Sequence, residues 1–174
     1  MKKRILTLVI LVAAVVFSNK AMAQKFPGLD KSPADIASYP RRGADKVMKI
    51  VYGRPQLKGR TVNSLAKPGK MWRLGANEAT EITFYKDVKF GGKSVKAGTY
   101  AMFAIPGKSE WTIILNKDLN VWGNYSYKEG QDVVRTTAKV SKNDTSVEAF
   151  AITYSKDGDI LLGWGNTVVT IPVK

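Results

Sequence analysis

The side chains with the greatest chemical capacity are gathered in one stretch, residues 71–80. Arginine in such a stretch offers a rigid fork of hydrogen-bond donors that matches carboxylate and phosphate groups. Together with Arg54 and Arg60, the stretch is therefore a candidate pocket for an anionic or sugar ligand. The predicted ligand-binding residues are Arg54, Trp72, Arg73, Asn77, Glu78 and Thr80. The last five supply, in that order, an indole, a guanidinium, a carboxamide, a carboxylate and a hydroxyl group.

The same composition also fits a purely structural role. Arg73 and Glu78 could form an internal ion pair, while Asn77 and Thr80 satisfy the backbone groups of a buried turn. Buried charges require such partners, and removing one partner typically costs about 3–5 kcal/mol. Buried polar networks are usually structural unless a cleft reaches them, so this interpretation competes directly with the ligand pocket.

A third interpretation is a hydrolase that works through Glu78. Glycoside cleavage needs two carboxyl groups held about 5–9.5 Å apart across the substrate. Glu81 is three residues away, and on a strand two residues at that spacing face opposite sides. The second carboxylate would then have to come from a distant residue such as Asp118 or Asp132, and we assign no catalytic residue beyond the candidate Glu78.

The absence of two amino acids restricts the chemistry of the site further. The chain has no cysteine and no histidine. It therefore has no disulfide, no serine–histidine–aspartate triad, no cysteine nucleophile and no ordinary zinc or copper site. Any acid or base must be Asp, Glu, Lys or Tyr, and we predict no metal and no cofactor.

The first 23 residues are typical of a secretory signal peptide. A basic start is followed by a 13-residue apolar run, Ile5 to Phe17, and by Ala21-Met22-Ala23. This run is shorter than the ~20 residues that span a bilayer. We therefore expect cleavage after Ala23 and an exported protein, periplasmic or secreted, that keeps no membrane span.

The mature chain would hold 151 residues, enough for one domain. Loss of the signal peptide's four basic residues lowers the net charge from +14 to +10. These charges are dispersed, and their attraction for polyanions is nonspecific and screened by salt. We expect no nucleic-acid binding, and name an unknown small molecule, a glycan or an envelope protein as the partner. The sequence does not define the oligomeric state.

Residues 24–43 are predicted to form an extended arm, in which Ser32-Pro33 could start one helical turn. After this arm, short β-type segments separated by turns dominate the chain. Gly91-Gly92 predicts a tight hairpin. The last third predicts four strands, at 133–140, 147–154, 160–164 and 167–173, with a turn at Gly165-Asn166. We predict an all-β fold: one antiparallel β-sandwich domain of about nine strands over residues 44–174, with a jelly-roll-like arrangement as one option.

Several motifs resemble one known family. They are Tyr52-Gly53-Arg54-Pro55, Lys58-Gly59-Arg60, the stretch Gly69 to Thr80, Lys96-Ala97-Gly98-Thr99-Tyr100 and Trp111-Thr112-Ile113-Ile114-Leu115-Asn116. The chain is similar over nearly its whole mature length to the domain of unknown function 2911 family. This resemblance implies an exported bacterial protein and fixes no activity.

Three hypotheses result from the sequence. The first is a noncatalytic exported β-sandwich protein that binds a ligand or partner at the cell envelope through residues 73–80, with Arg54 and Trp72. The second is a hydrolase that uses Glu78, and the third is a structural role for the whole stretch.

The export hypothesis makes a direct prediction about the mature N-terminus. In a host that processes secretory signals, we expect the purified protein to begin at Gln24 when intact mass and N-terminal peptides are read by mass spectrometry. Protein recovered with residues before Gln24 still attached would contradict the cleavage site.

Overall fold

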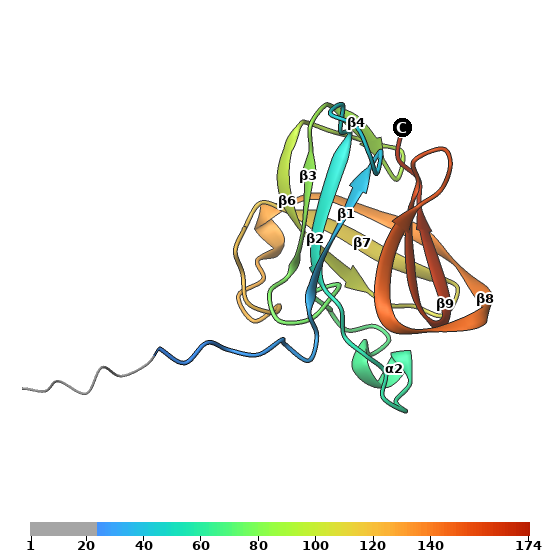
Figure 1. The fold of residues 1–174 in the computed structure, drawn as a ribbon. Coiled ribbons are helices and arrows are strands. Elements are labelled where there is room, and N and C mark those ends of the chain that lie inside the picture. Colours follow the sequence, from blue (N-terminus) through green and yellow to red (C-terminus); the bar gives the residue numbers. More distant parts are fainter. Residues whose placement is uncertain (1–23) are drawn as a thin grey trace, which may run out of the picture.

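The computed structural model describes residues 24–174, so the predicted signal peptide, residues 1–23, lies outside the described residues. Strands make up about half of the described chain (Figure 1). The elements are β1 Ala34–Tyr39, β2 Met48–Gly53, α2 Val62–Leu65, β3 Thr80–Phe84, β4 Val88–Phe90, β5 Lys93–Val95, β6 Gly98–Ile105, β7 Glu110–Asn116, the 3-10 helix η1 Glu129–Gln131, β8 Asp132–Tyr154 and β9 Ile160–Ile171. No helix within residues 24–174 has the length and apolarity needed to cross a membrane.

The strands form one seven-stranded antiparallel sheet in the order β1-β2-β3-β6-β7-β8-β9, and β4 and β5 form a separate hairpin. The predicted all-β, antiparallel fold with about nine strands is confirmed for the described residues. The strands of the large sheet are arranged in the order in which they occur along the chain. This order is an up-and-down meander and lacks the Greek-key crossings of the jelly-roll option. In Figure 1 the sheet curls until β1 and β2 face the long strands β8 and β9, which gives a sandwich-like shape.

Backbone bonds close the curled sheet where the chain leaves β2. The carbonyl oxygen of Pro55 accepts a hydrogen bond from the N–H of Phe150 (2.9 Å), and the N–H of Leu57 donates to the carbonyl of Glu148 (3.0 Å). Arg54 adds a side-chain bond, because its Nε donates to the carbonyl of Phe150 at 3.0 Å. The two ends of the sheet are therefore joined through the middle of β8.

Strands β8 and β9 are longer than the sequence predicts. Each was expected as two strands, but each runs continuously through the polar segment between the predicted halves. The pairing register shifts between Lys142 and Val147, and Val147 pairs with Gly165, which has a φ of 56°. Gly165 therefore bends a continuous strand instead of turning the chain, and such bulges increase the bend of a sheet.

Part of the predicted arm also joins the sheet. Residues 34–39 form edge strand β1, which pairs with β2, so the predicted helical turn at Ser32 is wrong. Pro33 and Pro40 delimit this strand, but its alternation of buried and exposed residues is too weak to identify it from sequence. Residues 24–33 are mostly exposed.

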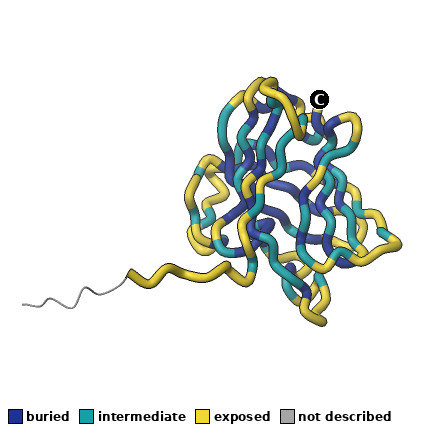
Figure 2. Tube along the Cα trace, in the orientation of Figure 1, coloured by how far each residue is buried: buried dark blue, intermediate teal, exposed yellow. Residues whose placement is uncertain are grey.

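The interior of the curled sheet holds the main hydrophobic core, and Figure 2 shows its buried residues along the strands. Aromatic rings concentrate at its centre. Trp72 stacks on Trp164 with ring centres 5.4 Å apart, and Trp111 and Phe150 meet Trp72 edge-on at 5.8 and 5.2 Å. Such aromatic contacts are each worth roughly 0.5–1.5 kcal/mol beyond the area they bury. The sheet therefore closes around a stack of indoles.

The hydroxyl of Tyr52 gives a specific test of sheet closure. It accepts a hydrogen bond from the buried N–H of Ile152 at 3.0 Å, and burial raises its pKa. We expect Tyr52→Phe to lower the free energy of unfolding by about 1–3 kcal/mol, because the N–H of Ile152 loses its partner. Urea denaturation followed by circular dichroism measures this change.

Tyr85→Phe is the matched control, since Tyr85 is 49% exposed. It should change the free energy of unfolding by less than about 0.5 kcal/mol. Equal stabilities for the two variants would show that the Tyr52 hydroxyl does not hold the sheet closed.

Candidate ligand-binding pocket

The predicted site divides at Leu74, and its first part belongs to the core. The backbone N–H of Trp72 donates to the carbonyl of Ala104 at 2.7 Å, and the N–H of Ala104 donates to the carbonyl of Trp72 at 2.9 Å. The indole Nε1 of Trp72 donates to the carbonyl of Gly75 at 3.2 Å. Only 7% of Trp72 is exposed. Trp72 is therefore a core residue, and a ligand at the surface does not reach its ring.

Thr80 closes the turn that follows. Its hydroxyl donates to the carbonyl of Leu74 at 2.8 Å, and its N–H donates to the carbonyl of Arg73 at 3.1 Å. Thr80 is completely buried, as the structural interpretation predicts. The ion pair of that interpretation is not formed among the described residues: Glu78 is exposed, and the buried Nε of Arg73 has no hydrogen-bond partner there.

The other arginines do not converge with Arg73. Arg54 pairs with Asp35 at 3.1 Å and binds the carbonyl of Phe150, so it fastens β1 and β2 to β8. Arg60 donates to carbonyls of its own turn, at 2.9 Å each. The structure therefore does not assemble the three-arginine anion pocket that the sequence suggested.

The second part of the site lines a cavity of about 310 Å³, which we call the Glu78 pocket. It lies between the end of β2, residues 75–79, the N-terminal arm and the loop after β7. Its polar and aromatic residues are Asp30, Ser32, Tyr52, Asn77, Glu78, Glu81, Asn120 and Trp122. Of the predicted ligand residues, only Asn77 and Glu78 line this pocket.

Close backbone packing fixes the wall of the Glu78 pocket that lies against β2. A Cβ atom on Gly53 would collide with the carbonyl oxygen of Ala76, so glycine is required there. Asn77 has a φ of 62°, a left-handed conformation that asparagine tolerates better than most residues. This kink directs the chain out of the core and toward the surface.

The opposite wall is the loop after β7, which pairs with the site by backbone bonds. The N–H of Gly123 donates to the carbonyl of Asn77 at 3.0 Å, and the N–H of Ala79 donates to the carbonyl of Val121 at 2.9 Å. These bonds set Trp122 directly opposite Glu78 in an antiparallel bridge. Residues paired in this way project on the same side, with Cβ atoms about 4.5–5.5 Å apart.

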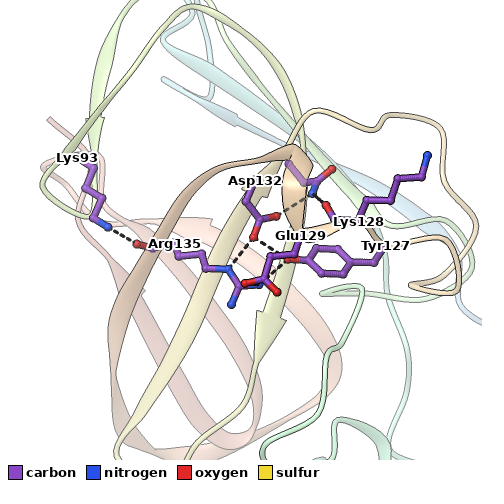
Figure 3. A network of polar contacts seen from close by, with 7 residues as sticks. Lys93, Tyr127, Lys128, Glu129, Asp132 and Arg135 are labelled. Atoms are coloured by element: carbon purple, nitrogen blue, oxygen red, sulfur yellow. Dashed lines mark hydrogen bonds and ion pairs between the residues drawn. The ribbon is translucent and has the colours of Figure 1, made fainter.

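A polar network anchors the C-terminal end of this loop (Figure 3). The carboxylate of Asp132 accepts hydrogen bonds from the Tyr127 hydroxyl (2.7 Å), from Nε of Arg135 (2.6 Å) and from Nδ2 of Asn116 (2.8 Å). Burial, and then the bond to Asp132, raise the pKa of Tyr127 to about 12. Tyr127 also packs on Phe103, so the loop that carries Trp122 is held at a defined place.

The Glu78 pocket collects negative charge. Asp30, Glu78 and Glu81 line it, and none of them forms an ion pair with a described residue. The backbone N–H of Ser32 and then the side chain of Asn77 lower the pKa of Asp30. Glu81 accepts a bond from the N–H of Asn120 at 2.7 Å.

Glu78 and Glu81 were expected to face opposite sides, and that prediction is wrong because both line the same pocket. The alternation rule applies within a strand, and β3 begins only at Thr80. Asp30, Asn120 and Trp122 were not assigned to the site either. The aromatic content of the loop after β7 was the one signal for Trp122, whereas nothing in the sequence associates the arm with residues 77–81.

Because the site is divided, we expect two substitutions in the same stretch to differ in their effect on the free energy of unfolding. We expect Thr80→Val to lower the free energy of unfolding by about 1–3 kcal/mol, because the buried carbonyl of Leu74 loses its donor. Glu78→Gln should change it by less than about 0.5 kcal/mol, because Glu78 is exposed and unpaired among the described residues. Thermal and urea denaturation measure both, and a marked loss of stability in Glu78→Gln would favour a structural role for Glu78.

Comparison with curated proteins and with solved structures gives no match. A family comparison does give one. The family described as "Protein of unknown function (DUF2911)" matches residues 32–173, so the resemblance noted from the motifs is confirmed and the chain belongs to this family.

Proposed function

We propose that the protein is exported and acts as a noncatalytic binding protein that holds a glycan in the Glu78 pocket. The observation that carries the proposal is the position of Trp122. Its side chain is 62% exposed, lies directly opposite Glu78, and lines a cavity that also presents carboxamide and carboxylate groups. Large aromatic residues are normally buried, so an indole kept at the surface beside hydrogen-bonding groups marks a binding site.

The chemistry of the pocket suits a sugar. The apolar face of a sugar ring can lie against an indole, while its hydroxyl groups donate to carboxylates and exchange hydrogen bonds with carboxamides. A volume of about 310 Å³ is at the small end of the range for ligand pockets and accommodates one or two sugar rings. The ligand is therefore held at one residue or at the end of a longer chain.

A larger cavity, about 670 Å³, lies beside α2 and supports binding less well. Its aromatic residue is Trp111, which is only 3% exposed because it packs in the core. That cavity therefore offers no aromatic surface on which a ring could stack.

A hydrolase is the second candidate, because the Glu78 pocket supplies the further carboxylates that this reaction requires. Asp30 is a poor choice for the proton donor, since its hydrogen bonds lower its pKa whereas a general acid needs a raised one. Glu78 and Glu81 remain as the pair to test.

The binding proposal predicts that Trp122 dominates affinity. Using protein that begins at Gln24, isothermal titration calorimetry with short neutral oligomers of glucose and of N-acetylglucosamine should detect a ligand. We expect Trp122→Ala to weaken its binding by about tenfold or more, through the lost stacking surface.

Tyr125→Ala is the matched control, because Tyr125 is on the same loop, is 83% exposed and does not line the Glu78 pocket. It should leave the affinity unchanged. Equal affinity for wild type and Trp122→Ala would contradict the assigned site. Release of shorter sugars by the wild type, lost in Glu78→Gln, would favour the hydrolase over the binding protein.

A further inference from the structure

We infer that the Glu78 pocket selects glycans that carry a positively charged amino group. This inference rests on the proposed glycan-binding function and specifies the class of sugar. The juxtaposition that carries it is an exposed indole placed opposite a carboxylate, in a cavity with two further carboxylates and no cationic side chain in its described lining.

The charge of the pocket is opposite to that of the whole protein. The chain has 28 lysines and arginines against 14 acidic residues. Even so, Asp30, Glu78 and Glu81 line one cavity to which the described residues contribute no lysine or arginine. Low-dielectric walls concentrate the field of like charges within a cleft, so this pocket attracts cations although the protein as a whole repels them.

The three carboxylates are only partly engaged by the protein. Asp30 accepts bonds from Ser32 and Asn77 through Oδ1, and Glu81 accepts its bond from Asn120 through Oε1. Glu78 accepts no hydrogen bond from a described residue and pairs with Trp122 only through the backbone. At least one oxygen of each carboxylate is thus left to accept from a ligand, and an ammonium group offers three donors.

Trp122 adds a second attraction for the same group. The face of an indole is electronegative, and a cation within about 6 Å of the ring centre gains roughly 0.5–1 kcal/mol at an exposed site. Because Glu78 and Trp122 are directly opposite, an ammonium group that contacts the carboxylate lies beside the ring. A neutral acetamido group in the same position obtains neither attraction.

The small and fixed shape of the pocket also favours an amine on a ring over a flexible amine. Backbone bonds from Gly123 to Asn77 and from Ala79 to Val121 hold the chain on both sides of Trp122, so little ordering of the backbone is needed when the ligand binds. Pre-organised sites lose less entropy on binding. A sugar ring places its amino group at a fixed distance from the face that stacks on the indole.

The test compares two ligands with the same sugar chain that differ in one substituent, a charged amino group or a neutral acetamido group. Short glucosamine oligomers, with the amines protonated in a mildly acidic buffer, are titrated against N-acetylglucosamine oligomers of the same length by calorimetry. We expect the glucosamine oligomers to bind roughly tenfold more tightly, and Glu78→Gln to remove most of that preference by weakening the glucosamine oligomers much more than the N-acetylated ones.

Glu110→Gln is the matched control, because Glu110 is exposed, forms no ion pair with a described residue and lies outside the pocket. It changes the net charge equally and should keep the preference. If Glu110→Gln lowers it as much as Glu78→Gln does, the attraction is nonspecific and the inference is overturned.

The remaining outcomes separate the inference from the proposed function. Equal binding of the two oligomers, lost in Trp122→Ala, overturns the selection for amines and leaves the glycan-binding function standing. If the glucosamine, N-acetylglucosamine and glucose oligomers all fail to bind, both the inference and the proposed function are overturned.

Discussion

The site depends on the close approach of residues 74–80 to the end of β2. The buried hydroxyl of Thr80 holds the carbonyl of Leu74, and Gly53 allows the backbone at Ala76 to pack against the strand without an intervening side chain. This turn sends Trp72 into the core and brings Asn77 and Glu78 to the surface. One short stretch therefore contributes both to the stability of the fold and to the wall of the pocket.

The side chains that stabilise the fold and those that line the pocket lie on opposite sides of this stretch. Toward the interior, Trp72 completes a stack with Trp164 around which the sheet closes. Toward the solvent, the same stretch pairs with the loop after β7 and places Glu78 opposite Trp122. Neither interpretation holds for the whole stretch, because Trp72 and Thr80 belong to the core whereas Asn77 and Glu78 line the pocket.

The Glu78 pocket also differs from the rest of the described chain in its charges. The ion pairs of the described chain lie elsewhere, at Arg54, Lys96, Lys128 and Arg135. The carboxylates of the Glu78 pocket have no such partner among residues 24–174. Leaving charges unpaired is inexpensive only where water or a ligand reaches them, as it does at an open cavity.

Sequence alone determined the fold class, the family and the importance of residues 71–80, because alternation, turn residues and motif spacing are local properties that the chain carries in order. It could not determine the division of that stretch or the identity of its partners. Asp30 and Trp122 meet Glu78 only because the sheet curls and the loop after β7 folds back, and these contacts join residues about 40–50 positions apart. The bend at Gly165 was likewise mistaken for a turn, since a bulge and a turn use the same glycine and polar residues and differ only in the pairing of the neighbouring strand. Local patterns thus predicted most of the strands, whereas closure of the sheet decided which side chains share a pocket.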